Sequence, residues 1–525
     1  MSTAPDLASP TASPHRGEPD DPRRWDDYLE RILTSPVYDV AIETPLERAP
    51  RLSTRLGDEL WLKREDLQPV FSFKIRGAYH KIAGLDPEVR ARGVVAASAG
   101  NHAQGVALAA RRFGCRAVIV MPAGTPRIKH EAVSALGGEV VLSGDTFHEA
   151  SARARDLAAA EGLAFIHPYD DPDVIAGQGT IGMEIFRQHR DPIDAIFVCV
   201  GGGGLAAGIG VYVKRLYPHV RVIGVEPVDA ASMHAALAAG APVDLPDVGR
   251  FADGVAVKRV GDETFRLCRE VVDEMVLVDN DEICAAIKDV FEDTRSILEP
   301  AGALAVAGAK AWVAREGAAG RCLVAIASGA NMNFDRLRFV AERAEIGEHR
   351  EAQLAVTIPE RPGAFLTLCT GIGDRNVTEF NYRRADAERA HVFVGVAVAD
   401  RGESRALCDQ LTGAGFGVVD LSDHELAKNH LKHLVGGRNP EVRHERILRF
   451  SFPERPGALR RFLEHLSPHF DISLFHYRNQ GGDVGRVLTG IVVEPGREAD
   501  FAAFLAALDY PYVDDTDDPA CRLFL

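Results

Sequence analysis

The sequence predicts an α/β protein in which parallel sheets are covered by helices on both faces and are followed by two smaller α+β units. Between about residues 93 and 330, short β-branched segments alternate with Ala-rich helical segments, which is typical of parallel strands joined by helices. After about residue 345 the pattern changes, and one α+β unit occurs twice with a repeat of about 95 residues. The length of 525 residues also favours several domains over a single core.

The first 25 residues are rich in proline, serine and aspartate, which is typical of a disordered segment. This segment lacks an apolar central region and contains several acidic residues, which argues against a transit peptide. The chain has no run of about eighteen apolar residues, so we expect no membrane span.

Six segments rich in apolar and β-branched residues are predicted to be buried strands: 93–98, 117–122, 139–143, 195–200, 220–227 and 322–328. The segment 102–114, after the first of them, has apolar residues at helical spacing and is predicted to be a helix. In folds of this kind, ligands bind beyond the carboxyl ends of the strands. The glycine-rich and polar clusters of this sequence follow the strands directly, so we expect the functional site there.

The two C-terminal units share the order of their elements. Strands of the first unit are predicted at 353–359, 377–384, 391–398 and 416–421. The second unit starts with a matching strand at 446–453, and the sequence Glu-Arg-Pro-Gly-Ala occurs in both units, at 360–364 and 454–458. These matches indicate an internal duplication. We therefore predict four parts, with the boundaries 1–27, 28–344, 345–435 and 446–525.

The composition argues against several classes of function. The formal net charge of −16 argues against nucleic acid as a partner, because phosphate contacts need a basic face. The eight cysteines are widely spaced and form no C-x-x-C pair. That spacing is typical of reduced thiols in a cytoplasmic protein and indicates neither a disulfide framework nor a zinc site.

The clearest chemical motif surrounds Lys74, which stands between Phe73 and Ile75. Apolar neighbours remove water from a lysine, which favours the neutral amine and lowers its pKa. A neutral amine can attack an aldehyde and form a Schiff base. The alternative is a lysine whose stem packs against the protein while its charged end reaches water.

A second motif, Ser98-Ala99-Gly100-Asn101-His102, lies between a predicted strand and a predicted helix. Ser98 and Asn101 could both cap the helix. Alternatively, exposed backbone amides at this end could hold a substrate carboxylate, with Ser98 and Gly100 as candidate substrate-binding residues. Asn101 has both donors and an acceptor and could bond a cofactor oxygen.

A glycine-rich loop, followed by Leu205, comes directly after the predicted strand 195–200; its members are Gly201, Gly202, Gly203 and Gly204. Their unobstructed amides could surround a phosphate at the positive end of a helix. Two other interpretations remain open, a purely structural tight turn and a loose dinucleotide-binding pattern, Gly202-x-Gly204-x-x-Ala207. In the second case, Glu226 would stand where a ribose-binding acid is expected.

Ser328 ends the last predicted strand of the α/β region. Its hydroxyl could bond to a heterocycle nitrogen at the carboxyl edge of the sheet. A turn-forming serine is the other interpretation.

Taken together, these segments resemble the fold-type-II pyridoxal-phosphate enzymes, and among them the biosynthetic threonine dehydratase family. The resemblance covers nearly the whole chain from about residue 28 to 525. It is carried by the segments 62–79, 98–105, 201–205, 299–303, 328–334, 420–438 and 473–478.

The resemblance implies a role for each motif. Lys74 would form the Schiff base with pyridoxal phosphate and act as the general base, and Phe73 would pack beside the cofactor ring. Asn101 would bond the phenolic oxygen, and Ser328 would pair with the pyridine nitrogen. The segment from Gly201 to Leu205 would hold the phosphate.

The resemblance also implies the reaction and its regulation. The substrate would be L-threonine, which is dehydrated and deaminated to 2-oxobutanoate and ammonia in the first step towards isoleucine. The duplicated units would be ACT-like regulatory domains of a homotetramer, with isoleucine as feedback inhibitor and valine as its antagonist. Candidate effector-contacting residues are Gly363 and Gly457 of the repeated turn and the matching Tyr382 and Tyr477. The repeated turn could equally serve only the shape of the chain.

Three other functions are considered. The same fold could serve a serine/threonine dehydratase or a racemase with different regulation. The chain could also be a non-catalytic amino-acid sensor, or a nicotinamide dehydrogenase built on the dinucleotide-binding pattern.

Overall fold

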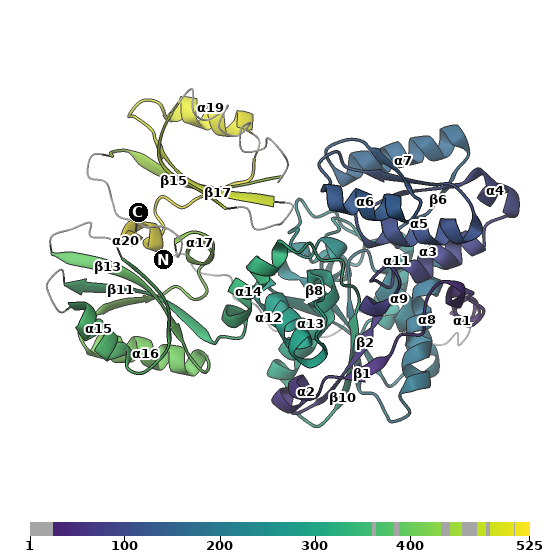
Figure 1. Ribbon diagram of the computed structural model, residues 1–525, viewed down its shortest axis with the longest axis horizontal. Coiled ribbons are helices and arrows are strands. Elements are labelled where there is room, and N and C mark those ends of the chain that lie inside the picture. The colour runs from purple at the N-terminus through teal and green to yellow at the C-terminus, as the bar shows by residue number, and fades with distance from the viewer. Residues whose placement is uncertain are drawn as a thin grey trace.

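The computed structural model describes residues 25–359, 364–382, 388–431, 442–453, 470–478, 484–508 and 510–524. A larger α/β part is formed by the chain up to α14, and two smaller α+β units lie beside each other on one side of it (Figure 1). Among the described residues, no helix combines the length and the apolar character that crossing a bilayer requires.

The α/β part contains two sheets. The larger sheet has six strands in the order β1 (Leu46–Arg48), β2 (Glu59–Arg64), β10 (Cys322–Ala327), β7 (Ala195–Cys199), β8 (Arg221–Pro227) and β9 (Glu274–Val278). The smaller sheet has the order β5 (Glu139–Leu142), β4 (Ala117–Met121), β3 (Val94–Ala97) and β6 (Ala164–Phe165). All pairs are parallel except β1 with β2. The six strands predicted from the sequence are confirmed, whereas β1, β2, β6 and β9 were not predicted.

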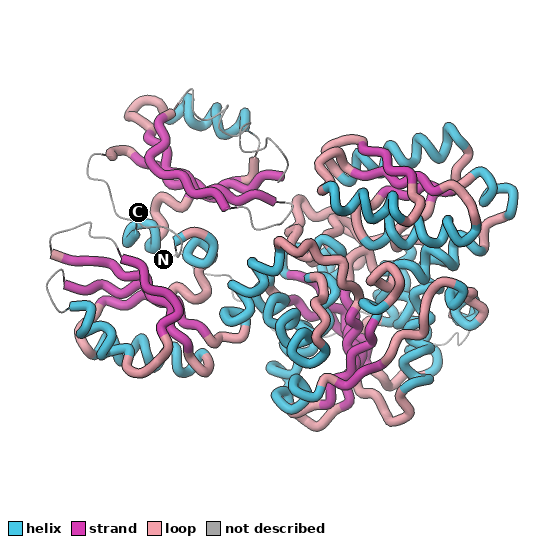
Figure 2. Tube along the Cα trace, viewed as in Figure 1, coloured by secondary structure: helices cyan, strands magenta, loops and turns pink. Residues whose placement is uncertain are grey.

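Helices cover both faces of these sheets (Figure 2). Around the small sheet lie α3 (Lys74–Ala83), α4 (Pro87–Arg92), α5 (Asn101–Phe113), α6 (Arg127–Ala135) and α7 (Phe147–Glu161). The other helices of this part are α1 (Asp26–Leu33), α2 (Pro50–Leu56), α8 (Pro172–Gln188), α9 (Gly204–Leu216), α10 (Ser232–Ala239), α11 (Asp262–Val271), α12 (Asn280–Thr294), α13 (Pro300–Glu316) and α14 (Arg336–Gly347). The helix predicted at 102–114 is confirmed as α5.

Local sequence explains where several helices start and how closely they pack. Thr146 with Glu149 forms a capping box for α7, and Asp279 with Glu282 forms one for α12. Helices α8 and α9 approach closely at Gly208, where a Cβ would overlap the backbone of α8. The buried strands β3, β4 and β7 are apolar throughout, as expected for parallel strands covered on both faces.

The start of the α/β part differs slightly from the prediction. Helix α1 begins at Asp26, before the boundary expected at residue 28. Trp25 and Tyr28 are both buried in the main core, where α1 packs against α8 and α9. At the other end, α14 runs across the boundary expected at residue 345. The domain boundaries as such stay a prediction.

The two C-terminal units have the same antiparallel topology. The first contains β11 (Glu351–Pro359), α15 (Ala364–Ile372), β12 (Val377–Tyr382), β13 (Arg389–Ala397), α16 (Arg401–Gly413), β14 (Gly417–Asp420) and α17 (Glu425–Asn429). The second contains β15 (Glu445–Pro453), β16 (Asp471–Arg478), β17 (Val484–Val492), α19 (Glu498–Leu508), β18 (Tyr512–Asp514) and α20 (Pro519–Phe524). Their sheet orders, β12-β13-β11-β14 and β16-β17-β15-β18, are equivalent. The duplication is therefore confirmed.

The equivalence extends to an irregularity in each sheet. The register shifts at Thr378 in β12 and at Ser473 in β16. Each hydroxyl bonds to a glutamate on the first strand of its own unit, Glu351 or Glu445. A glycine on the neighbouring strand leaves room for each hydroxyl, namely Gly395 for the first unit and Gly490 for the second.

The short helices α17 and α20 lie between the two units (Figure 1). Their apolar side chains join residues from both sheets in one buried cluster, which includes Phe393, Leu426, Leu488 and Cys521. Because this cluster draws on both units, it holds them together as a pair.

Candidate active site

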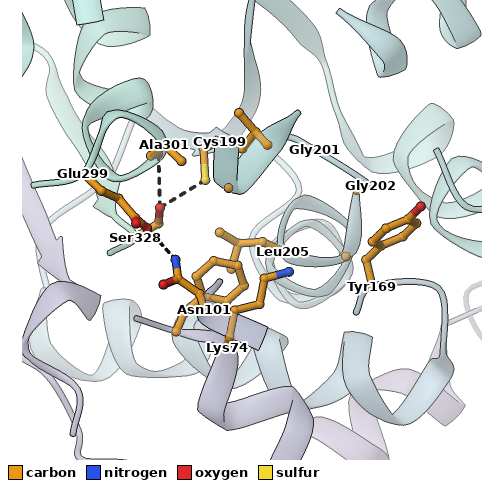
Figure 3. Close-up of a pocket in the computed structure, with 15 residues that line it drawn as sticks. Lys74, Asn101, Tyr169, Cys199, Gly201, Gly202, Leu205, Glu299, Ala301 and Ser328 are labelled. Carbon is orange, nitrogen blue, oxygen red and sulfur yellow. Dashed lines mark hydrogen bonds between the residues drawn. The ribbon is translucent and has the colours of Figure 1, made fainter. Parts of the chain in front are cut away.

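A pocket with an empty volume of about 430 Å³, including open solvent at its mouth, lies at the carboxyl ends of β7 and β10. Figure 3 shows the side chains around it. The lining consists of Phe73, Lys74, Asn101, Tyr169, Cys199, Gly201, Gly202, Gly203, Gly204, Leu205, Gly254, Val255, Glu299, Ala301 and Ser328. The structure thus brings together the lysine, asparagine, glycine-loop and serine residues that the sequence singled out.

Lys74 is the first residue of α3, and its amine donates to the carbonyl oxygen of Pro168 at 3.0 Å. The amine also lies 5.2 Å from the centre of the Phe73 ring. Burial lowers the pKa of Lys74 from 10.5 to about 8, against opposing effects of Cys199 and Glu299. Lys74 is therefore a partly buried amine on the pocket wall, and its pKa lies much nearer to neutral pH than that of an ordinary lysine.

A buried ionic cluster fixes the start of α3. Arg76 is fully buried and binds Glu65 at 2.7 Å and Glu184 at 2.5 Å. Lys63 adds a second contact to Glu184, at 2.6 Å. The four side chains carry two positive and two negative charges, so each buried charge has a partner. The cluster ties α3 to β2 and α8 and so holds Lys74 in place.

Asn101 is the first residue of α5, and its side chain does not cap that helix. Its Oδ1 accepts from Nδ2 of Asn331 at 2.6 Å, and its Nδ2 donates to Oε1 of Glu299 at 2.5 Å. The capping interpretation of Asn101 is therefore wrong, since both ends of the amide are held at the pocket.

The glycine-rich loop needs glycine for two reasons. Gly203 has a φ of +98°, which side chains rarely adopt, and a Cβ at Gly202 would overlap the Tyr169 ring. Tyr169 is held in turn by a hydrogen bond from its hydroxyl to Arg259 O at 3.2 Å. The loop precedes α9, whose N-terminus has no side-chain cap. Its amides can therefore bind an anion from the pocket.

Ser328 follows β10 and is only 2% exposed. Its hydroxyl donates to the carbonyl oxygen of Ala301 at 3.2 Å, and the Cys199 thiol donates to it at 3.3 Å. The hydroxyl is thus an uncharged polar group on the pocket wall, beside the buried thiol of Cys199.

The two candidate substrate-binding residues lie beside the pocket without lining it. The Ser98 hydroxyl accepts from the Gly100 amide at 3.2 Å, which is a local turn contact. A Cβ at Gly100 would meet nothing within 4 Å, so the chain is open to a ligand at that position. Their role stays a prediction.

Of the four regulatory candidates, two lie outside the described residues and two are described only in their backbone. Gly363 and Gly457 fall in gaps, and the side chains of Tyr382 and Tyr477 are likewise not described.

Glu299 was missed at the sequence level. It precedes α13 and is 4% exposed, and its carboxyl faces Asn101 in place of capping α13. Burial, reinforced by Asp253, raises the pKa of Glu299 to about 7. The segment 299–303 carries part of the resemblance, but nothing near Glu299 in the sequence indicates that its carboxyl faces Asn101. Tyr169 and Cys199 were likewise given no role in the site.

Glu226 does not support the dinucleotide interpretation. The residue is fully buried, and its carboxylate accepts from the amides of Met233 at 2.7 Å and His234 at 2.8 Å. It therefore holds the start of α10 and is not a lining residue of the pocket.

The lining residues fit pyridoxal phosphate. Lys74 supplies an amine for an aldehyde, the glycine loop supplies amides for a phosphate, and Asn101 and Ser328 supply polar groups for the ring. Gly201, Gly202, Gly203 and Gly204 all line the pocket and carry no side chains, which allows a phosphate to approach the backbone amides closely. Fold and pocket together define a pyridoxal-phosphate-dependent enzyme of fold type II.

Comparison with known proteins gives the family. Residues 37–329 match the pyridoxal-phosphate dependent enzyme family, and residues 342–431 and 436–525 each match the C-terminal regulatory domain of threonine dehydratase. The biosynthetic L-threonine dehydratase of Burkholderia multivorans is 58% identical over 502 residues, which cover 95% of this chain and 99% of that relative. This chain belongs to the biosynthetic threonine dehydratase family.

Two solved structures extend the comparison. The processed form of threonine deaminase isoform 2 from Solanum lycopersicum is 54% identical, with a TM-score of 0.62 over 64% of this chain and 91% of that chain. Serine racemase from Dictyostelium discoideum is 32% identical, with a TM-score of 0.55 over 59% of this chain and 98% of that chain. The α/β part is thus shared with enzymes that differ in reaction.

Proposed function

We propose that this chain catalyses the pyridoxal-phosphate-dependent dehydration and deamination of L-threonine to 2-oxobutanoate and ammonia, under feedback control by isoleucine. The observation that carries the proposal is the placement of Lys74, an amine with a pKa of about 8 that faces the glycine loop across one pocket. When bound, the cofactor supplies a conjugated ring that accepts charge from the substrate.

Each lining residue has a role in this proposal. The neutral Nζ of Lys74 takes the proton from the substrate Cα as general base. The loop amides would hold the phosphate, and Asn101 would donate to the phenolic oxygen. Ser328 would turn its hydroxyl from the carbonyl oxygen of Ala301 to donate to the neutral ring nitrogen, whereas a carboxylate there would keep that nitrogen protonated. A weaker electron sink favours early loss of the β-hydroxyl over racemisation.

Replacement of Lys74 tests the catalytic proposal. We expect Lys74→Ala to lower threonine turnover by about 100- to 10,000-fold, the usual contribution of a positioned general base. The purified variant should also lack the visible absorbance of attached cofactor. Lys258→Ala is the matched control, because that side chain is 53% exposed and is not a pocket-lining residue. Wild-type turnover by Lys74→Ala would contradict the proposal.

The likeness to serine racemase gives the second candidate, a serine dehydratase or racemase. Incubation of the wild-type enzyme with L-serine and with L-threonine separates these functions. We expect 2-oxobutanoate from threonine as the faster product, and no accumulation of D-serine. D-serine as the main product would favour the racemase.

A buried polar network supports regulation through the C-terminal units. Arg343 of α14 binds Asp281 of α12 at 2.8 Å, Glu425 of α17 at 3.0 Å and Asn429 of α17 at 2.7 Å. Lys428 of α17 binds the same Asp281 at 2.5 Å. These contacts, which we call the α14 network, join the α/β part to the first regulatory unit.

The α14 network also reaches the second unit, since Arg486 of β17 donates to Asn429 at 3.2 Å. A change in either unit would therefore alter contacts to α12. In this proposal isoleucine and valine act on the regulatory units with opposite effects, and the protein is a cytoplasmic homotetramer. Titration of threonine turnover with each amino acid tests the effectors, and light scattering of the purified protein tests the tetramer.

A further inference from the structure

A chain of hydrogen bonds fixes the orientation of the Asn101 amide. Nδ2 of Asn331 donates to the carbonyl oxygen of Val70 at 2.8 Å, and a backbone carbonyl can only accept. The same Nδ2 donates its second hydrogen to Oδ1 of Asn101 at 2.6 Å. The amide group of Asn101 is therefore set with its oxygen towards Asn331 and its nitrogen towards Glu299.

This orientation decides what Asn101 can offer a ligand. One hydrogen of its Nδ2 goes to Oε1 of Glu299 at 2.5 Å. The second hydrogen remains for the pocket, which Asn101 lines. Asn101 is thus a hydrogen-bond donor towards the ligand, which suits an oxygen with negative charge.

Glu299 lines the same pocket beside this donor. Its backbone amide donates to Gly329 O at 3.1 Å, and the residue is 4% exposed. The charged and titratable groups that act on its carboxyl or that it acts on are Asp253, Lys129, Arg336, Lys74 and Cys199. Lys129 and Arg336 are themselves engaged by Asp253, at 2.8 Å and 3.5 Å. Lys74 is the cation on the pocket side of Glu299.

We propose that Glu299 is a positioning residue that, with Asn331, holds Asn101 as a donor to the cofactor, and that the charge of Glu299 also acts on the amine of Lys74. The proposal rests on pyridoxal phosphate being the cofactor. In the ionised form, Glu299 strengthens the donor and favours a protonated Lys74. In the protonated form, it does neither.

Loss of the Glu299 charge should change the pKa of Lys74 in one definite direction. Burial lowers the pKa of Lys74, and the charge of Glu299 opposes that effect. Removing the charge of Glu299 therefore lowers the pKa of Lys74 further, so the neutral amine forms at lower pH. The rate at which apoenzyme takes up pyridoxal phosphate follows the neutral amine, so it should respond in the same direction.

The experiment measures attachment of pyridoxal phosphate to apoenzyme between pH 6 and pH 10, by the growth of visible absorbance. For the wild type we expect the rate to rise with pH and to level off above about pH 8. In Glu299→Gln, the side-chain oxygen can still accept from Asn101 while the charge is lost. The midpoint, which is the pH at which the attachment rate reaches half its maximum, should therefore be lower for Glu299→Gln than for the wild type.

Two further variants separate charge from position. Glu299→Asp keeps the charge but draws it back from Asn101, so affinity for the cofactor should fall while the midpoint stays closer to that of the wild type. Asn331→Ala removes the bond that orients Asn101 without removing a charge. It should weaken cofactor affinity by about 2- to 12-fold, the effect of one ordinary hydrogen bond, with an unchanged midpoint.

Glu131→Gln is the control, because that glutamate is 57% exposed and pairs with Arg127 on the surface. Equal midpoints for Glu299→Gln and the wild type would overturn the charge effect. Unchanged affinity in both Asn331→Ala and Glu299→Asp would overturn the positioning role.

If Glu299→Gln does not fold, the other two variants still decide the positioning role. Failure of the wild type to take up pyridoxal phosphate at all would instead refute the proposed function.

Discussion

At the scale of single residues, Gly202 is where the pocket depends most directly on the absence of a side chain. Its position faces the ring of Tyr169, which is anchored through its hydroxyl to the backbone of Arg259. The ring cannot move away from Gly202 without losing that hydrogen bond, so a side chain at Gly202 has no room.

Replacement of Gly202 by alanine should therefore disrupt cofactor binding. We expect Gly202→Ala to lower the affinity for pyridoxal phosphate by at least tenfold, because the new methyl group forces either the loop or Tyr169 to move. Equilibrium dialysis of the apoenzyme against the cofactor measures this. Gly413→Ala is the control, since a Cβ there meets nothing within 4 Å. Equal affinities for the two variants would show that the loop does not hold the cofactor.

The sequence predicted those site residues whose role depends on their immediate neighbours in the chain. Lys74 stands among apolar residues and the glycine loop directly follows a strand, so both could be recognised locally. Glu299 could not, because its partner Asn101 lies 198 residues away. Only the fold brings the two side chains together.

At the scale of elements, strand β2 was also missed because distant residues decide its environment, whereas β6 was missed because it is short. Strand β2 ends in Lys63 and Arg64, which are normally exposed residues and made the segment look polar. Both are buried, and their charges are compensated by Glu184 and Asp66. Strand β6 spans only two residues, too few for any periodicity.

The matched irregularities of β12 and β16 give a prediction for each regulatory unit. A methyl group at Gly395 would overlap the Thr378 hydroxyl, and one at Gly490 would overlap that of Ser473. We expect Gly395→Ala and Gly490→Ala each to destabilise its own unit by about 1–3 kcal/mol, the usual effect of overpacking. Calorimetric unfolding measures the effect, with Gly413→Ala again as control.

The two glycine variants also address which unit senses isoleucine. The variant with the weaker isoleucine response identifies the unit that the response requires. If both variants unfold as the wild type does, the hydroxyl contacts do not constrain the sheets.

At the scale of the whole molecule, the α14 network is a direct polar contact between the α/β part and the regulatory units. Arg343 and Asp281 are 3% and 6% exposed, so their charges interact with little screening by water. Glu425 is about half exposed, and its contribution to the network is correspondingly smaller.

Breaking the α14 network should weaken inhibition by isoleucine without abolishing the turnover of threonine. In Arg343→Met the contacts to Asp281 and to α17 are lost while the stem of the side chain is kept. We expect the isoleucine concentration for half inhibition to rise, by up to the 5- to 150-fold that a coupling of about 1–3 kcal/mol allows. Steady-state turnover of threonine with and without isoleucine measures this, and turnover without isoleucine should change little.

Arg338→Met is the matched control for that experiment. Arg338 lies on the same helix, is 69% exposed and pairs only with Glu342 among the salt bridges described. If it reduced isoleucine inhibition as much as Arg343→Met, the effect would belong to the helix as a whole and not to the network.

The course of α14 has a practical consequence for building hybrid enzymes. A cut at residue 345, which the change in sequence pattern suggests, would divide this helix within its last turn. The helix packs against α12, so it belongs with the α/β part although it leads into the first regulatory unit. A chimaera that takes its regulatory half from a relative should keep Arg336–Gly347 from the catalytic donor and take α17 from that donor too. Exchanging one without the other would pair Arg343 with a foreign surface.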